Sequence, residues 1–275
     1  MRERLSSDSA FAAKTHIISS FAIFALLLSY FPNLIYKLIG TTEFMSIITA
    51  SMVVAAASLM PDLDNTQSKA MNTTGIVGKL LSKAMRGSAV VVYNLTKTSR
   101  DDQNANPHRG FWHSLFGALT IWGITFSLTS ITVQVTLGGE KYAIGALFAL
   151  IIILFSSYML FETATDLFLG GKTSSFVSAI LALSFASIVF IVIPDLTRNF
   201  SWIANCLGIG WVAHILGDMM TTQGVPLFSP VFKRKGKRWW YYRLTSIKSG
   251  GDIENLILLP LFSGLLIFSI VRMFF

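Results

Sequence analysis

A histidine and an aspartate four residues apart, His214 and Asp218, lie near the end of an apolar run. On a helix, residues at this spacing share one face with about 6 Å between their Cβ atoms, a common way to present two ligands to one metal ion. An ionisable residue inside an apolar helix is costly and normally marks a functional site. We therefore interpret the pair as metal ligands, with a hydrogen-bonded structural pair as the alternative.

Two carboxylates, Asp62 and Asp64, directly follow another apolar run, which ends at Met60 and Pro61. If this stretch is extended, side chains two residues apart point to the same side, which suits paired or bridging coordination of a metal. An acidic turn after a helix could also be a solvated terminus. The histidines found elsewhere in the chain favour the ligand interpretation.

The three remaining histidines also lie at the ends of apolar runs. His16 opens the first run, and His108 and His113 precede the third. Residues five apart do not share a face of a straight helix, so we expect His108 in a loop and His113 in a first helical turn, with a bend that Gly110 permits.

Four histidines and three aspartates are enough for one or two metal ions. The mixed nitrogen and oxygen ligands favour a divalent transition metal, Zn²⁺ with Mn²⁺ or Fe²⁺ as alternatives, over Mg²⁺ or Ca²⁺. A single ion, with the other acids holding its ligands in place, is the second interpretation.

Two charged residues beside these ligands could act on a substrate. Arg109 offers a planar fork that binds phosphate or carboxylate oxygens, although it could instead be one more cation facing the inner leaflet. Glu254 precedes the last apolar run and is our candidate general base. The sequence has no Gly-x-Ser-x-Gly, His-Glu-x-x-His or Gly-x-x-x-x-Gly-Lys motif, so it lacks the signatures of three large enzyme classes.

The composition places these residues in a membrane protein. Of 275 residues, 53% are hydrophobic and 13% charged, and the mean hydropathy is +0.61. Soluble domains carry about 25% charged residues. A soluble enzyme and a disordered chain are therefore excluded, and the single Cys206 cannot form an intramolecular disulfide.

Seven apolar stretches approach the roughly 20 residues that a helix needs to cross a bilayer. We predict an all-α polytopic bundle of about seven transmembrane helices that forms a single membrane domain, residues 1–275. The expected spans are 17–35, with a break at Pro32, 44–60, 115–137, 143–161, 174–193, 202–220 and 255–271.

The distribution of basic residues predicts the orientation of these helices. With seven crossings, eighteen Lys and Arg residues fall on the side of the N-terminus and four on the other side. Positively charged loops stay in the cytoplasm, so we predict a cytoplasmic N-terminus. This topology puts all seven candidate ligands at cytoplasmic helix ends, although the charge count used no His or Asp.

Two long segments are expected on the cytoplasmic side. Residues 65–107 form an insert in which positions 75–95 have helical periodicity and a basic face, so we predict a helix lying on the inner leaflet. Residues 221–254 form a loop that contains the run KRKGKRWWYYR. Such a run can bind nucleic acid, but Trp, Tyr, Lys and Arg also concentrate at lipid headgroups, so we expect membrane lipids as partners and no nucleic acid.

Four sequence blocks together resemble the YdjM family of inner-membrane proteins, which are described as metal-dependent hydrolases. The chain departs from the family pattern at Asn65, where a His is common, and at Phe111-Trp112. The resemblance implies a multi-pass protein of the inner membrane, with the metal at His16, Asp62, Asp64, His108, His113, His214 and Asp218, and with Arg109 and Glu254 at other polar motif positions. The blocks are Thr15-His16, Leu59-Met60-Pro61-Asp62-Leu63-Asp64, His108-Arg109-Gly110-x-x-His113-Ser114, and His214-x-x-x-Asp218 with Gly224-Val225-Pro226-Leu227.

These observations lead to one principal functional hypothesis. We expect a membrane-bound metal-dependent hydrolase that cleaves a phosphoester of a lipid or lipid-linked substrate at the cytoplasmic face through a metal-activated water. The alternatives are an ion or metal transporter, because transporters also use intramembrane acids and histidines, and a non-enzymatic scaffold held together by metal.

Overall fold

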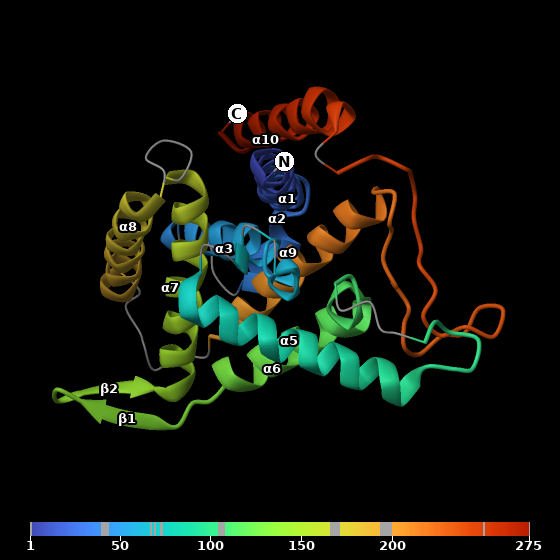
Figure 1. Ribbon diagram of the computed structural model, residues 1–275. Coiled ribbons are helices and arrows are strands. Elements are labelled where there is room, and N and C mark those ends of the chain that lie inside the picture. Colours follow the sequence, from blue (N-terminus) through green and yellow to red (C-terminus); the bar gives the residue numbers. More distant parts are fainter. Residues whose placement is uncertain are drawn as a thin grey trace.

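The computed structural model describes residues 2–39, 44–66, 68, 70–71, 74–103, 108–165, 171–192, 200–249 and 251–274. This part of the chain contains nine α-helices and one β-hairpin (Figure 1). Residues 104–107 of the predicted polar loop, residue 193 at the end of a predicted span, and Lys69, Arg198 and Gly250 lie outside the described residues.

The helices follow the apolar runs of the sequence. The break at Pro32 is confirmed, since the helix ends at Tyr30 and a new one begins at the proline, which lacks a backbone N–H. The helices are α1 (Arg2–Tyr30), α2 (Pro32–Ile39), α3 (Phe44–Ala57), α5 (Gly75–Thr96), α6 (Leu115–Thr129), α7 (Ile144–Thr165), α8 (Gly171–Val192), α9 (Trp202–Met219) and α10 (Leu259–Phe274).

Five helical segments of the described chain are long and apolar enough to cross a membrane. Helix α6 is apolar but has only 15 residues, about 22 Å at 1.5 Å per residue. Helix α9 has 18 residues but carries the polar pair His214 and Asp218. The five segments are Ala13–Tyr30, Phe44–Asp64, Ile144–Thr165, Ser175–Val192 and Glu254–Met273. The crossings by α6 and α9 stay predictions.

The predicted span over residues 115–137 is wrong at its end, and the fold is not purely helical. Strand β1 (Gln134–Leu137) pairs antiparallel with β2 (Glu140–Ala143). β-branched residues such as Val135 favour a strand here. The connecting residues Gly138 and Gly139 both have positive φ, 61° and 91°, as a two-residue hairpin turn requires.

Helix α9 packs against α3 and α6 at the centre of the molecule. A methyl group on Gly210 would collide with the carbonyl oxygen of Val54, so only glycine lets the backbones of α9 and α3 approach this closely. One residue further on, Trp211 is buried and donates from its indole nitrogen to the carbonyl oxygen of Trp112 at 2.7 Å. These contacts fix the end of α9 relative to α3 and to the turn that precedes α6.

The predicted helix over 75–95 is confirmed as α5, which crosses α6 in Figure 1. The Trp112 indole donates to the Met85 carbonyl oxygen at 2.8 Å and so joins α5 to the turn before α6. Ile76 and Leu80 are exposed on the opposite side of α5. Its contact with the inner leaflet stays a prediction.

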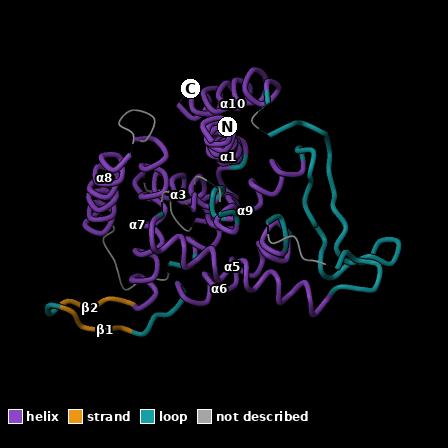
Figure 2. The backbone as a smooth tube through the Cα atoms, in the orientation of Figure 1, coloured by secondary structure: helices purple, strands orange, loops and turns teal. Residues whose placement is uncertain are grey.

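The basic and aromatic loop is irregular and docks beside the end of α5 (Figure 2). The Asp101 carboxylate accepts backbone hydrogen bonds from Thr98 at 2.7 Å, Trp239 at 2.9 Å and Arg238 at 3.2 Å. Partial burial raises the pKa of Asp101, but these hydrogen bonds outweigh it and hold the pKa below its usual value. This ionised carboxylate fastens the loop to the insert together with the hydrogen bonds that Arg238 and Trp239 donate to Thr96.

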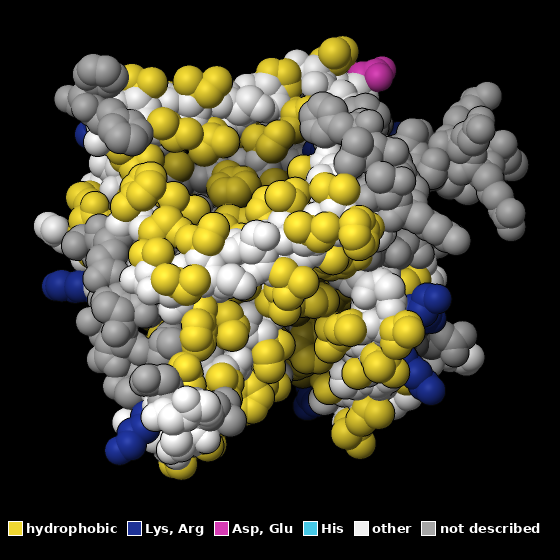
Figure 3. Space-filling view, turned by 90° about the vertical axis from the view of Figure 1, so that its left-hand side faces the viewer, with side chains coloured by type: hydrophobic (Ala, Val, Ile, Leu, Met, Phe, Trp, Pro, Cys, Tyr) yellow, Lys and Arg dark blue, Asp and Glu magenta, His cyan; other side chains and the backbone are white. Residues whose placement is uncertain are grey.

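The face of the molecule on the side of α8 is covered largely by hydrophobic side chains (Figure 3). Lys and Arg side chains appear at the margins of this face rather than across it. Leu183 and Ile188 of α8 are among the exposed hydrophobic residues. A surface of this kind is stable against lipid rather than water.

Candidate metal centre

All seven predicted ligands lie in one connected cluster, where four chain segments meet. The side chains come from α1, from the 3-10 turn η1 (Pro61–Asp64) after α3, from the 3-10 turn η2 (Phe111–His113) before α6 and the bend that precedes it, and from the end of α9. His16 lies in the middle of α1, where its apolar segment Ala13–Tyr30 begins, and not at a helix end as predicted. Because this segment and α6 start where α3 and α9 end, the antiparallel arrangement of the helices itself creates the cluster.

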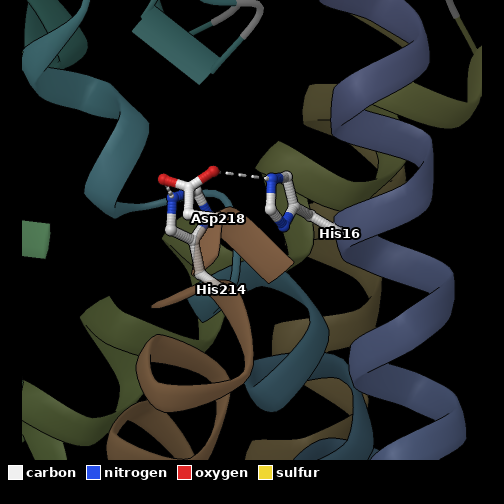
Figure 4. A group of neighbouring side chains, drawn as sticks. All are labelled: His16, His214 and Asp218. Carbon is white, nitrogen blue, oxygen red and sulfur yellow. Dashed lines mark ion pairs between the residues drawn. The ribbon is translucent and has the colours of Figure 1, made fainter. Parts of the chain in front are cut away.

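The pair on α9 faces His16 on α1 (Figure 4). His214 Nε2 lies 3.3 Å from Asp218 Oδ2, and His16 Nε2 lies 3.7 Å from Asp218 Oδ1. The rings of His16 and His214 stack with their centres 4.2 Å apart. A methyl group on Gly217 would come within 3.0 Å of the His16 ring, so glycine leaves room for this approach.

A backbone carbonyl fixes the protonation of His214. Nδ1 of His214 lies 2.6 Å from the carbonyl oxygen of Ser58, so this nitrogen carries the hydrogen and Nε2 keeps its lone pair for a metal. Ser58 follows directly after α3, where the last carbonyls of a helix lack intrahelical partners. Sequence reasoning missed Ser58, because a backbone acceptor has no side-chain signature and only the predicted helix end marks it.

Asp62 and Asp64 do not lie on an extended strand, so the prediction that they point to the same side is wrong. Pro61 starts a 3-10 turn instead, as its fixed φ favours at a first helical position. Asp62 Oδ1 lies 3.6 Å from His113 Nε2 and 3.7 Å from His214 Nε2. Asp64 is turned toward the other nitrogen of His113, Nδ1, at 3.4 Å.

His108 lies in a bend and His113 in a helical turn, as predicted, and their rings meet edge to face with centres 5.2 Å apart. His108 Nδ1 lies 2.8 Å from Asp64 Oδ1. The bend covers residues 108–110, as predicted at Gly110, which has a φ of −92° and a ψ of −134°, and it also takes Arg109 to a φ of 58°. A left-handed residue other than glycine costs about 1–2 kcal/mol, and such strain clusters at functional sites.

His113 lies among three carboxylates. Burial lowers the pKa of His113, but Asp64, Asp62 and Asp218 outweigh this effect and raise it to about 10. His113 is therefore protonated while no cation is bound, and the three carboxylates, Arg109 and His113 together carry one negative charge. A metal ion that displaces the His113 proton would meet two negative charges. A single divalent cation would balance that charge.

Arg109 is buried and holds the cluster to the loop after α9. Its Nη2 lies 2.9 Å from Asp218 Oδ1, and Nη1 donates to Thr221 Oγ1 at 2.5 Å and to the Gly224 carbonyl oxygen at 3.3 Å. Its Nε has no hydrogen-bond partner within the described structure. The guanidinium thus orients a candidate ligand and keeps one N–H for another acceptor.

Glu254 lies apart from the candidate ligands. It is buried at the start of a π-helical turn, η3 (Glu254–Leu258), and lines a cavity of about 210 Å³ together with His16 and Thr221. It belongs to none of the three groups of residues that could hold a metal within the described chain. The structure therefore places Glu254 beside the cluster, across a cavity.

The residues fit a metal ion. The structure has three groups whose ligand atoms lie within 4.8 Å of one another, namely His16, His214 and Asp218; Asp62, His113 and His214; and Asp64, His108 and His113. Several of their buried atoms have no hydrogen-bond partner among the described residues. These atoms are Asp64 Oδ2, His113 Nδ1 and Nε2, His214 Nε2 and Asp218 Oδ2.

Comparison with known proteins gives one result that covers nearly the whole chain. The model of the YdjM inner membrane protein family matches residues 12–274. No curated protein matches the chain. No solved structure matches it either.

Proposed function

The chain belongs to the YdjM inner membrane protein family, and from this premise we propose that it is a metal-dependent hydrolase of phosphoesters. The supporting observation is the set of buried ligand atoms on His113, His214, Asp64 and Asp218 that face one another at 3.3–3.5 Å without a hydrogen bond among the described residues. Leaving a buried polar atom unpaired costs about 1–3 kcal/mol, so several at one point favour a bound cation. Mixed nitrogen and oxygen ligands favour Zn²⁺, with Mn²⁺ and Fe²⁺ as alternatives.

We favour one ion over two because of the histidine tautomers. A neutral imidazole offers one lone pair, and in His214 this is on Nε2, which belongs to both groups that contain this residue. If His113 also uses Nε2, its Nδ1–H faces Asp64. In this proposal His113, His214, Asp62 and Asp218 hold the ion with His16 beside them, while Asp64 orients His108 and His113.

The chemistry then divides between the metal and the chain. A bound divalent metal supplies Lewis-acid chemistry, lowering the pKa of water and polarising a phosphoryl oxygen. Arg109 orients Asp218 and donates its free Nε–H to a phosphoryl oxygen, where charge develops during attack. Glu254, on the far side of the cavity, accepts a proton from the attacking water.

The substrate side of the proposal follows from the membrane setting. We propose seven crossings, with α6 and α9 added to the five candidate spans, and a cytoplasmic N-terminus. The cluster then lies near the cytoplasmic surface, within reach of phospholipids and polyprenyl phosphates. No nucleic acid partner is proposed, because the loop after α9 carries the aromatic and basic residues of a membrane anchor.

The test is metal content and turnover of the detergent-purified full-length protein, prepared without chelator. We expect one transition-metal ion per chain and hydrolysis of at least one member of a panel of phospholipids, polyprenyl phosphates and generic phosphodiesters. Asp62→Asn should lose both. Asp102→Asn, a matched change at an exposed aspartate, should lose neither.

The same experiment separates the alternatives. Metal-loaded protein that turns over nothing in the panel, yet carries metal or protons into vesicles, would be a transporter. Protein that unfolds on metal removal but shows neither flux nor turnover would be a scaffold. Wild-type protein that binds no metal, even after soaking, would refute a metal-dependent function of all three kinds: hydrolase, transporter and scaffold.

A further inference from the structure

An apolar groove runs from the metal centre along the side of the helical bundle. The cavity of about 210 Å³ beside His16 and a larger hollow of about 620 Å³ share Ile23, Ala213 and Leu216 in their walls. Because the two spaces have these side chains in common, they adjoin each other, and we treat them as two sections of one groove. Its two ends differ in chemistry.

The end at the metal centre contains polar side chains in a wall that is otherwise mostly apolar. His16, Thr221, Ser249 and Glu254 lie in the wall of the smaller cavity. Thr221 also accepts a hydrogen bond from Arg109, whose Nε lacks a partner within the described structure. An anionic head group at this end would therefore lie close to both a guanidinium and the candidate metal ligands.

The long section is apolar and open toward the outside of the bundle. Its wall comes from one face of α9, with α1 and α6 on the two sides. Leu216 is 44% exposed and Leu119 of α6 is 60% exposed. The candidate ligands His214 and Asp218 are buried. Helix α9 thus contributes both to the metal cluster and to the groove.

The far end of the groove is closed by hydrogen bonds between three helices. The Trp122 indole of α6 donates to Asn205 Oδ1 of α9 at 2.9 Å, and Asn205 Nδ2 donates to the Leu38 carbonyl oxygen of α2 at 2.6 Å. From Asn205 to Gly217 the wall follows α9 for twelve residues, about 18 Å at 1.5 Å per residue. One leaflet contributes about half of the ~30 Å hydrocarbon core.

We infer that this groove binds one hydrocarbon chain of a membrane lipid whose phosphate head group lies at the polar end. The length of the groove matches the depth of one leaflet, its wall is apolar where a chain would lie, and it opens toward the bilayer. The inference rests on the proposed function for its substrate class, and it assigns the lipid chain to a defined surface.

Photocrosslinking tests this assignment. The full-length protein is placed in phosphatidylcholine nanodiscs that contain a small fraction of phosphatidic acid with a diazirine midway along one acyl chain. After irradiation, mass spectrometry maps the crosslinked peptides. We expect crosslinks to concentrate on α6 and α9, around Leu119 and Leu216, over those on α8.

A blocking variant and a matched control accompany the wild type. Leu216→Trp places a larger ring where the two sections meet and should reduce crosslinking to α9 about tenfold, the equivalent of 1.4 kcal/mol of binding. Leu183→Trp makes the same change on α8, at a residue 56% exposed, and should leave the map unchanged. Because the wild-type map is informative by itself, the test survives if Leu216→Trp fails to fold.

The outcomes also separate this inference from the proposed reaction. Crosslinks spread evenly over α6, α8 and α9, or unaffected by Leu216→Trp, would mean ordinary bilayer contact and would overturn the groove. Crosslinks confined to the groove with no hydrolysis of any phosphoester would retain lipid binding and refute the hydrolase. Hydrolysis of soluble phosphodiesters with an even map would retain the hydrolase and refute the groove.

Discussion

Replacing Asp64 by Asn should weaken metal binding without abolishing it. Asp64 is 1% exposed, and its two oxygens face His108 Nδ1 at 2.8 Å and His113 Nδ1 at 3.4 Å. On our assignment these nitrogens carry hydrogens, so the carboxylate orients both rings and raises the basicity of His113 as a ligand. The amide keeps one oxygen as an acceptor but removes the negative charge.

The size of the effect follows from the kind of contact that is lost. Removing a carboxylate that holds a metal-bound histidine typically lowers metal affinity by 10–100-fold, which corresponds to about 1.4–2.8 kcal/mol. A direct ligand behaves differently, because its loss removes a bond to the ion itself. Asp64→Asn should therefore raise the dissociation constant within this range while the protein still binds one ion at saturating metal.

The assay is a competition titration with a coloured chelator, combined with elemental analysis of the saturated protein. Asp102→Asn serves as the control for the loss of a carboxylate. Asp102 is exposed, and its ion pair is with Lys237 of the basic loop, at 3.8 Å, and not with a residue of the cluster. A fall from two ions to one in Asp64→Asn would refute the reasoning, since it would show that Asp64, His108 and His113 hold an ion of their own. An unchanged affinity would show that Asp64 orients nothing.

Three further outcomes are expected. Arg109→Lys should lower turnover about 10²-fold or more, the cost of losing one preorganised donor. It should also lower the melting temperature, because one ammonium cannot replace the contacts to both Asp218 and the loop. A variant with wild-type activity would exclude this role of Arg109. The docking of the basic loop should be stable above about pH 4, the ordinary carboxyl range, and should be lost at lower pH as Asp101 is protonated through its lowered pKa. Hydrogen exchange at the Trp239 amide, measured against pH, tests this expectation. A Trp239 amide that stays protected in Asp101→Asn would contradict it. Reporters fused after Lys141 should read periplasmic and those fused near Asp101 cytoplasmic, and the reverse result would mean that the spans are miscounted.

The sequence predicted the position of the site better than its internal geometry. Hydropathy and the Lys and Arg distribution together placed the seven candidate ligands at the same end of the predicted spans, and the structure brings them together, although His16 lies in the middle of a helix that extends further than predicted. The direction in which Asp62 points depends on whether Pro61 begins a turn or ends a strand, and both are compatible with proline at that position. The positive φ of Arg109 was not predicted, because propensity favours glycine wherever φ is positive and tertiary contacts of the guanidinium override that preference here.

The β-hairpin shows a different reason why the sequence analysis misplaced the end of a predicted span. The residues from Ile131 to Leu137 are apolar enough to extend a membrane span by hydropathy alone, but their β-branched side chains and the following Gly138-Gly139 pair favour a strand and a turn. Hydropathy measures the transfer of side chains and contains no information about backbone conformation. Turn chemistry at the end of each apolar run is therefore needed to find where a helix stops.

The hydrogen bond from His214 to the carbonyl oxygen of Ser58 affects how this protein tolerates mutation. Every amino acid has a backbone carbonyl, so no substitution at position 58 deletes the acceptor. An alanine at position 58 would remove the hydrogen bonds that the Ser58 hydroxyl donates to the carbonyl oxygens of His16 and Ala55, but it would leave the bond to His214 in place. The tautomer of His214 is thus buffered against substitution of the residue that sets it, whereas changes that shift the end of α3, such as a larger residue at Gly210, can disturb it.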